Sequence, residues 1–373
     1  MIKDFEYIVV GAGISGATIA ERIANVLEKK VLVIEKRNHV GGNCYDFYDK
    51  AGILVPKYGP HFFHTNNERV WKYVSQFTKW RKYKHQVVAL VKGRLVPVPV
   101  NINTINILFK ENLKSKNDML HWLEKEVIRT KKPKNSKEVA LSLVGKRLYK
   151  MIFENYTKKQ WGKDPEKLKP EVLARIPINM SFDNYYFKDK YQAMPMPNYT
   201  SIFRKMLSSR NIKIILNQDY YNIKKDINPK AKIFFTGRID NFFQDLHGKL
   251  EYRSLNFEYQ TLKLEKFQIL AQVNYPEKEF PWTRITEPKH ATGQKSKYTT
   301  IIYEYPSKKG EPYYPVLSEK NIKLYERYKK EALNLETKEK LYLLGRLANY
   351  KYFNMDQAFE NALNFFERIK EQI

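Results

Sequence analysis

The sequence predicts an α/β fold in which a parallel nucleotide-binding sheet is combined with a helical insertion and a separate antiparallel sheet. Three observations lead to this fold class. A short β-branched run, Ile8–Val10, passes directly into a glycine-rich turn and then into a helical segment. Helical patterns dominate from about residue 103 to residue 150. Strand-like segments lie on both sides of that stretch, so we expect a second sheet assembled from separated pieces of the chain.

The first forty residues follow the order strand, turn, helix, strand. Ile8–Val10 leads into G-x-G-x-x-G at residues 11–16, then a helix over 17–27 and a second strand that ends at Ile34. The first glycine permits the tight turn, the second lets the backbone approach a pyrophosphate, and the third allows close packing of helix and strand. Free N–H groups at the start of the helix would bind the phosphates. The pattern predicts a Rossmann-like dinucleotide-binding domain. The alternative is a glycine turn that serves packing alone.

Glu35 and the residues after it favour FAD over NAD. The Glu35 carboxylate follows the second strand, where it would accept hydrogen bonds from ribose hydroxyls. A short basic loop and the pair Gly41-Gly42 come next. This arrangement resembles the extension of glutathione-reductase-like FAD proteins, which include the amine oxidases; a glycine-rich surface turn is the alternative. The cofactor contacts predicted here are Gly11, Gly13, Ile14, Ser15, Gly16 and Glu35.

We expect three parts, two of them discontinuous in sequence. Lys213–Leu216 and Lys232–Thr236 have the composition of buried strands that return to the dinucleotide-binding sheet. The predicted parts are an FAD-binding domain of residues 1–80, 199–245 and 332–373, a helical domain of residues 102–180, and an antiparallel-sheet domain of residues 81–101, 181–198 and 246–331.

Within these parts, several elements have clear local signals. The segments 85–91 and 95–98 flank Lys92-Gly93 and predict a hairpin, and further strands are expected over 267–275 and 298–305. Helices are expected over 117–124 and 136–149, the second capped by Asn135 or Ser136. Asn354 and Gln357 fit the capping positions of a C-terminal helix. The start of that helix would stabilise negative charge on a flavin placed beside it, although an ordinary terminal helix is the alternative.

Composition limits the function classes. The chain has 67 Lys and Arg against 40 Asp and Glu, a net charge of +27, but the lysines lie in scattered pairs. This distribution favours a solvated surface over a nucleic-acid interface. The single cysteine, Cys44, excludes an internal disulfide and a cysteine-cluster metal site. We find no apolar run of about 18 residues and no signal peptide, so we expect a cytoplasmic protein without a membrane span.

Three motifs lie outside the dinucleotide-binding pattern. They are YGPHFFHT at 58–65, NYTKKQWG at 155–162 followed by PEVLARIP at 170–177, and PWTRITE at 281–287. Together with YYP at 313–315 and GRLANYKY at 345–352, they resemble the UDP-galactopyranose mutases. The resemblance runs essentially end to end, from Tyr7 to the C-terminal helix.

The resemblance implies a reaction, a cofactor and partners. Members of that family interconvert UDP-galactopyranose and UDP-galactofuranose, for cell-surface polysaccharide, through a covalent adduct between N5 of reduced FAD and the sugar. It further implies an external reductant such as NAD(P)H, a homodimer, and no metal or nucleic acid. Two alternatives stay open: an FAD oxidoreductase of amine-oxidase type, and a mutase that also accepts UDP-N-acetylgalactosamine. A third and weaker alternative is a non-enzymatic basic protein in which FAD has only a structural role.

The resemblance also implies roles for individual residues. Arg175 and Arg284 would clamp the diphosphate, with Arg175 on a mobile lid near residues 162–176, and His64 would face the flavin near His85. Tyr186, Tyr314 and Tyr352 would donate to the diphosphate, while Phe153, Tyr156, Thr157, Trp161 and Asn274 would hold the uridine. The further flavin contacts would be Lys36, Gly42, Asn43, His61, Arg346, Tyr352, Asn354 and Met355.

One position departs from the family's pattern. Most bacterial members have Asp in a Y-x-D-M-D string, where this chain has Asn354. Asn caps a helix as well as Asp does, so the fold should be preserved. The substitution removes a negative charge beside the flavin and the sugar, so we expect retained activity with an altered flavin potential or sugar preference.

Overall fold

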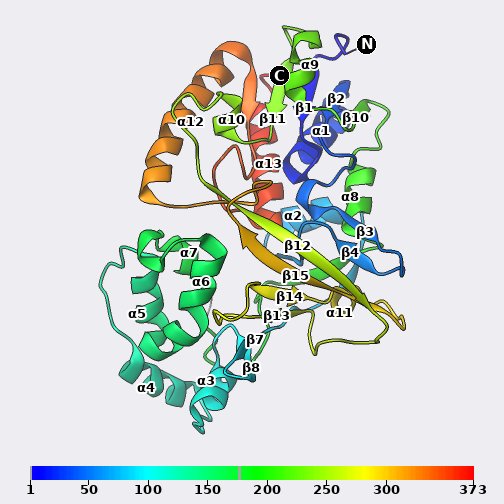
Figure 1. Ribbon diagram of the computed structural model, residues 1–373. Helices are drawn as coiled ribbons and strands as arrows, with labels where there is room; N and C mark the ends of the chain where they lie inside the picture. The colour runs from blue at the N-terminus through cyan, green and yellow to red at the C-terminus, as the bar shows by residue number, and fades with distance from the viewer. Residues whose placement is uncertain (1, 175–177) are drawn as a thin grey trace.

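The dinucleotide-binding part is built on a five-stranded parallel sheet. The computed structural model describes residues 2–174 and 178–373 (Figure 1). The strand order is β10-β2-β1-β11-β17, and each neighbouring pair is parallel. The central strands are buried because both faces of the sheet are covered. The strands are β1 (Tyr7–Val10), β2 (Val31–Ile34), β10 (Ile212–Ile215), β11 (Lys232–Phe235) and β17 (Leu341–Leu343). The predicted strand–turn–helix–strand order and both returning strands are thereby confirmed.

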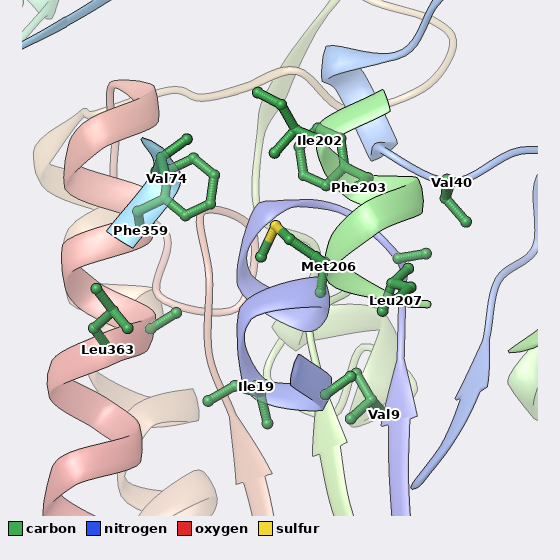
Figure 2. Close-up of a cluster of buried hydrophobic side chains, with 14 of the residues drawn as sticks. Val9, Ile19, Val40, Val74, Ile202, Phe203, Met206, Leu207, Phe359 and Leu363 are labelled. Atoms are coloured by element: carbon green, nitrogen blue, oxygen red, sulfur yellow. The ribbon is translucent and has the colours of Figure 1, made fainter. Parts of the chain in front are cut away.

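One apolar cluster holds the helices to this sheet. Figure 2 shows side chains from α1 (Ile14–Val26), α8 (Tyr199–Met206) and α13 (Met355–Ile369) meeting above β1. Ile19 of α1 and Phe366 of α13 are essentially unexposed. Phe203 of α8 belongs to the same cluster, and a Cβ on Gly41 would lie 3.0 Å from its ring. The cluster therefore packs the C-terminal helix and the Gly41-Gly42 loop against the first helix.

The antiparallel sheet has seven strands in the order β16-β12-β15-β14-β13-β7-β8. In Figure 1 it lies between the parallel sheet and the helical part. All neighbouring pairs are antiparallel except β13 with β7. The strands are β7 (Val87–Val91), β8 (Arg94–Val98), β12 (Tyr252–Leu262), β13 (Gln272–Asn274), β14 (Arg284–Thr286), β15 (Thr299–Ser307) and β16 (Tyr314–Pro315). The predicted hairpin and the strand near 298–305 are confirmed.

Two sequence expectations about this sheet are wrong. The strand expected over 267–275 is reduced to β13, because the amides of Phe267 and Gln268 donate to the Glu287 carboxylate at 2.9–3.2 Å. The segment 181–198 was grouped with this sheet, but its strand β9 (Tyr191–Met196) pairs with β5 (Phe63–Thr65) and β6 (Lys79–Lys82) instead. The long strand β12 was not foreseen.

The helical part contains the expected helices. The Asn135 side chain accepts from the Glu138 N–H and caps α5, as the sequence indicated. Its elements are α3 (Ile102–Phe109), α4 (Lys116–Glu126), α5 (Ser136–Leu148), the π-helical turn η2 (Tyr149–Phe153), α6 (Glu154–Trp161), η3 (Pro165–Lys167) and α7 (Glu171–Ala174). Figure 1 shows these helices projecting away from the parallel sheet.

The remaining elements are short, apart from α12. They are η1 (Gly42–Cys44), β3 (Asp46–Tyr48), β4 (Leu54–Pro56), α2 (Glu68–Ser75), α9 (Tyr220–Ile223), η4 (Lys224–Asp226), α10 (Ile239–Phe242), α11 (Lys289–Thr292) and α12 (Glu319–Glu339). At the start of α13, the Asn354 N–H donates to Gln357 Oε1 at 3.0 Å, so this helix begins where the sequence indicated. Within residues 2–174 and 178–373, no helix combines the length and apolarity needed to cross a bilayer.

Phe203→Ala tests the packing beneath the Gly41 loop. Because the Phe203 side chain is 1% exposed, we expect its removal to lower the unfolding free energy by about 4 kcal/mol. Urea unfolding followed by circular dichroism would measure the loss. Phe267→Ala is the matched control, since Phe267 is 44% exposed and its change should cost about 0.5 kcal/mol. Equal losses in the two variants would contradict this interpretation of the core.

Candidate functional site

A cavity of about 500 Å³ opens at the carboxyl ends of β1, β2 and β11. Such a position at the ends of parallel strands is where open α/β sheets bind ligands. The cavity lining brings together eleven of the predicted cofactor residues: Gly11, Gly13, Ile14, Ser15, Glu35, Lys36, Gly42, Asn43, His61, Arg346 and Met355. Gly16, Tyr352 and Asn354 are not part of that lining.

Two glycine-containing loops form one side of this cavity. The Gly41 N–H donates to the Ala12 carbonyl at 2.8 Å, which joins the second loop to the first turn. A Cβ on Gly42 would lie 2.8 Å from the Cα of Gly13, and Gly42 has a φ of +54°. Side chains at these positions would therefore push the loops apart. Gly16 has another role: a Cβ there would collide with the Gly11 carbonyl, so Gly16 serves the packing of α1.

Glu35 is buried at the rim of the same loops. Its Oε2 accepts from the Ala12 N–H at 2.8 Å, and its Oε1 accepts from the Arg37 N–H at 2.9 Å. Each carboxylate oxygen keeps a further lone pair, so the group can still accept hydrogen bonds from a ligand. Lys36 instead pairs with Glu311 at 2.8 Å, and the segment Gly310–Tyr313 also lines the cavity.

A second group of polar residues lies on the antiparallel sheet. Arg284 of β14 stands directly opposite Asn274 on β13 and opposite Glu304 on β15. The Arg284 guanidinium donates to Glu304 Oε1 at 2.8 Å, and the Glu304 side chain is only 2% exposed. Neither Arg284 Nε nor Glu304 Oε2 has a hydrogen-bond partner. A buried donor without a partner, on a cation, is suited to an incoming anion.

Electrostatics keep Arg284 charged in this place. Burial by itself would lower the pKa of Arg284, but the nearby Glu304 carboxylate more than offsets burial and holds that pKa well above its usual value. Tyr156 of α6 lies close to the same pair, and burial raises its pKa to about 12. The phenol of Tyr156 therefore stays protonated and can act as a hydrogen-bond donor.

Aromatic side chains connect this sheet region to the cavity. Tyr314 and Tyr352 stack with ring centroids 5.3 Å apart, and Trp161 of α6 lies 6.3 Å and 6.5 Å from them. The Arg346 guanidinium, which lines the cavity, lies 5.8 Å from the ring centroid of Tyr314 and 5.4 Å from that of Tyr352. Tyr186 contacts the nearby His85 by a backbone hydrogen bond of 2.8 Å. Trp161, Tyr314 and Tyr352, which are far apart in sequence, thus form one aromatic cluster beside Arg346.

His64 lies in a separate cluster near the start of α13. Its Nδ1 is 3.1 Å from Asp189 Oδ2, and its ring stacks on Phe187 at 3.6 Å. Asp356 lies close enough for the two groups to interact electrostatically; burial raises the Asp356 pKa, and His64 acts in the opposite direction. Asp356 Oδ1 is buried without a hydrogen-bond partner. The imidazole therefore lies near two carboxylates, one of which is within hydrogen-bond distance.

Some predicted residues are buried among their neighbours in the described structure, and one falls outside the described residues. The ring of His85 stacks on Phe62 at 3.7 Å, and its Nδ1 is 3.1 Å from the Tyr83 hydroxyl. Phe153 and Thr157 are buried, Phe153 in the core of the helical part. Arg175 lies outside the described residues. Across the described ranges, no cluster of three His, Cys, Asp or Glu side chains could hold a metal ion.

Sequence reasoning missed Glu304, Asp189, Lys159 and Arg253. Glu304 interrupts the apolar run TTIIYEY at 299–305, and an acid within an expected buried strand is a usable signal. Asp189 lies in a polar loop, KDK, that has no such signal. Lys159 and Arg253 are two among many basic residues, and only their partners distinguish them.

Comparisons with known proteins agree with one another. Residues 151–352 match the family described as UDP-galactopyranose mutase, and residues 9–77 match an NAD(P)-binding Rossmann-like domain. A probable UDP-galactopyranose mutase of Klebsiella pneumoniae is 36% identical over 95% of this chain and 92% of that protein. A dTDP-fucopyranose mutase of Escherichia coli is 34% identical over 95% and 96%, respectively. The UDP-galactopyranose mutase of Mycoplasma genitalium is 34% identical over 96% and 93%.

Solved structures show the same fold. The crystal structure of a reduced UDP-galactopyranose mutase superposes with a TM-score of 0.78 at 16% identity, over 99% of this chain and 94% of that one. A putative protoporphyrinogen oxidase from Exiguobacterium superposes with a TM-score of 0.66 at 12% identity, over the full length of both chains. The predicted Rossmann-like α/β fold is confirmed by the first of these likenesses.

Glu304→Gln tests whether Arg284 sits in an anion site. Removing the carboxylate charge should lower the unfolding free energy by about 2 kcal/mol, because a largely buried guanidinium loses its charged partner. Inorganic pyrophosphate should then raise the melting temperature of the variant more than that of the wild type, since the anion replaces the lost charge. Glu258→Gln, at an exposed strand position, is the control. Equal pyrophosphate shifts in wild type and Glu304→Gln would argue against an anion site.

Acid pH should destabilise the fold through buried imidazoles. Burial lowers the pKa of His39 and of His61 to about 4, and that of His85 to about 3, against about 6.5 in an unfolded chain. Unfolding therefore takes up protons between about pH 6.5 and pH 4, so the unfolding free energy falls as pH falls through this window. Urea unfolding at stepped pH would show the slope. His85→Gln should flatten it by up to about 1.4 kcal/mol per pH unit, whereas the exposed His121→Gln should leave it unchanged.

Proposed function

Because the chain belongs to the UDP-galactopyranose mutase family, we propose that it interconverts UDP-galactopyranose and UDP-galactofuranose. The observation that carries the proposal is the convergence of Arg284, Tyr314, Tyr352 and Trp161 beside a cavity with a dinucleotide-binding turn. Such a site can hold a nucleoside diphosphate and present the sugar to a cofactor in the adjacent cavity. An isomerase of this kind needs both sites in contact, and Arg346 borders both.

The residues around the cavity fit FAD. Gly11, Gly13 and Gly42 leave the backbone open to a pyrophosphate, and a Cβ at Gly42 would disrupt that side of the cavity. Glu35 retains the acceptor capacity for a ribose. The resemblance assigns the flavin contacts to Arg346, Met355 and the other residues named above. When bound in its reduced form, FAD supplies a nucleophilic ring nitrogen for the anomeric carbon of the sugar.

The chain's own residues would stabilise the departing diphosphate. Arg284 keeps its charge and has an unpartnered Nε, so it can donate to phosphate oxygens as negative charge develops there. Burial raises the pKa of Tyr314, so its phenol stays protonated and can donate within the same cluster. Tyr352 is proposed as a second hydroxyl donor by family resemblance. Arg175 is proposed as the second cation, by family resemblance. Trp161 and Tyr156 would hold the uracil and ribose, with Phe153, Thr157, Tyr186 and Asn274 around them.

His64 is proposed to face the cofactor, as the family resemblance implies. Its Nδ1 faces Asp189, which leaves Nε2 for the opposite side of the ring. Asp356 at the start of α13 adds a second carboxylate near that ring. Asn354 supplies no negative charge at this helix start, which supports the expected change in flavin potential or sugar preference.

A second candidate substrate follows from one relative. The dTDP-fucopyranose mutase of Escherichia coli is nearly as similar to this chain as the mutase of Klebsiella pneumoniae, at 34% against 36% identity. A dTDP-linked 6-deoxysugar is therefore the runner-up substrate, ahead of UDP-N-acetylgalactosamine and of an oxidoreductase of amine-oxidase type. We further propose a cytoplasmic homodimer that an external reductant such as NAD(P)H activates.

A paired assay tests the proposal. The purified protein is incubated with UDP-galactofuranose, and separately with dTDP-fucofuranose, with and without dithionite. Chromatography should show UDP-galactopyranose, formed mainly when dithionite is present. Conversion of the dTDP sugar alone would transfer the proposal to the second substrate. No conversion of either sugar by flavin-loaded, reduced protein would refute the mutase function.

Arg284→Ala should lower kcat/KM by about 10³-fold while leaving flavin bound, because it removes charge stabilisation of the leaving diphosphate. Trp161→Ala should mainly weaken UDP binding. Steady-state kinetics and flavin absorbance would separate the two effects. Arg129→Ala is the matched control, since the Arg129 side chain is 79% exposed. Near-normal turnover in Arg284→Ala would remove Arg284 from the proposed site.

A further inference from the structure

Four backbone carbonyls converge on one lysine of α6. Lys159 Nζ donates to the carbonyl oxygens of Tyr275 at 2.5 Å, Trp282 at 2.9 Å, and Glu277 and Phe280 at 3.0 Å each. An ammonium has three protons, so these acceptors use its full donor capacity. All four belong to one loop, residues 275–283, which has no regular secondary structure. The loop is therefore wrapped around the Lys159 ammonium.

The neighbouring lysine shows that this is a specific arrangement. Lys158 is paired with the Glu154 carboxylate at 3.1 Å and with that of Asp164 at 3.4 Å, and both are ordinary partly exposed ion pairs. Lys159 has no carboxylate among its hydrogen-bond partners. Burial lowers the pKa of Lys159 to about 8, and the nearby Glu277 and Glu279 carboxylates act in the opposite direction, so the amine is mainly protonated at neutral pH. Lys159 thus holds the backbone of the 275–283 loop, whereas Lys158 forms ion pairs at the surface of the helix.

The carboxyl end of α6 is fixed from a second side. Arg253 of β12 donates through Nε to the Gln160 carbonyl at 2.9 Å and through a terminal nitrogen to the Lys159 carbonyl at 3.1 Å. These carbonyls have no partner within the helix, so the guanidinium satisfies the helix end. Gly162 ends the helix with a φ of +63°, and a Cβ there would lie 2.7 Å from Arg253. The two hydrogen bonds from Arg253 therefore join the end of α6 to β12 of the antiparallel sheet.

The loop held by Lys159 connects two residues of the candidate site. It begins directly after Asn274 on β13 and ends directly before Arg284 on β14. The Tyr275 N–H donates to the Thr283 carbonyl at 2.8 Å and closes the base of the loop. On the other side, Lys159 lies one helical turn after Tyr156 and two residues before Trp161. A single ammonium therefore links the helix of the nucleoside pocket to the strand of the diphosphate-binding arginine.

We propose that Lys159 is a positioning residue for nucleotide recognition, which sets the distance between the base-binding side chains of α6 and the Arg284 guanidinium. The inference rests on the proposed nucleotide-sugar function, since it assigns to Lys159 the geometry of that site. Loss of the ammonium would release the loop and loosen the coupling between α6 and β14, with Arg253 left as the remaining anchor of α6. The nucleotide would then lose simultaneous contact with Trp161 and Arg284, while the cofactor cavity, which includes neither element, would keep its shape.

Lys159→Met removes the ammonium and keeps most of the side-chain volume. We expect the UDP dissociation constant and the KM of the nucleotide sugar to rise at least tenfold, while kcat falls less than threefold. Flavin occupancy should stay unchanged. Titration calorimetry with UDP, steady-state kinetics and flavin absorbance give these three readouts. Lys158→Met is the matched control and should leave all of them at wild-type values.

Hydrogen exchange provides a readout that does not depend on the substrate. The Tyr275 and Thr283 amides should exchange faster in Lys159→Met than in the wild type, because the loop has lost its anchor. Lys159→Gln retains a donor and should give smaller changes in exchange and in UDP affinity. Lys159→Gln also provides the test of the proposal if Lys159→Met does not fold.

The outcomes separate the two claims. Wild-type protein that neither binds UDP nor converts a sugar nucleotide would refute the proposed function, whatever the exchange data show. A functional wild type with unchanged UDP affinity in Lys159→Met would overturn the role of Lys159. A fall in kcat with unchanged KM would overturn it as well, and so would loss of flavin from both Lys159 variants, since Lys159 would then support the whole fold.

Discussion

One row of cross-strand neighbours on the antiparallel sheet determines the geometry of the candidate site. Asn274, Arg284 and Glu304 lie side by side on β13, β14 and β15. Because side chains alternate between the faces of a sheet, a register shift of one residue in β14 would turn Arg284 to the other face. It would also leave Glu304 buried without its cation. The Arg284–Glu304 ion pair therefore forms only in the observed register of β14, and it stabilises that register.

The candidate site combines residues from three parts of the chain, each of which packs around its own hydrophobic core. The dinucleotide cavity belongs to the parallel sheet, Arg284 to the antiparallel sheet, and Trp161 to the helical part. Arg346 and the stacked pair Tyr314 and Tyr352 lie where the three parts meet. Each part alone holds only some of the residues of the candidate site. The anchoring of α6 by Arg253 and Lys159 explains how a projecting helical part can present residues to a site on the sheet.

The fold was largely predictable, and its failures have physical causes. The glycine turn and the β-branched strands have local signals, so the parallel sheet followed from the sequence. The strand β12 was missed although residues 255–260, LNFEYQ, alternate apolar and polar side chains, which is a usable strand signal. The strand expected over 267–275 was too long because two of its backbone amides donate to the Glu287 carboxylate instead of to a neighbouring strand. Glu287 lies about twenty residues away in sequence, so no local pattern indicates this competition.

For the candidate site, the sequence by itself determined the glycine turn of the Rossmann-like part, and the family resemblance predicted arginines for a diphosphate and aromatic residues for a base. Their local motifs are short and directly follow recognisable strands or helices. Only the tertiary structure decided which charges meet, because Glu304, Asp189 and Lys159 acquire their partners across strand registers and loops. The position of an acid or a lysine in the sequence does not show which groups it will contact. Its role depends on what long-range packing places within about 3 Å of it.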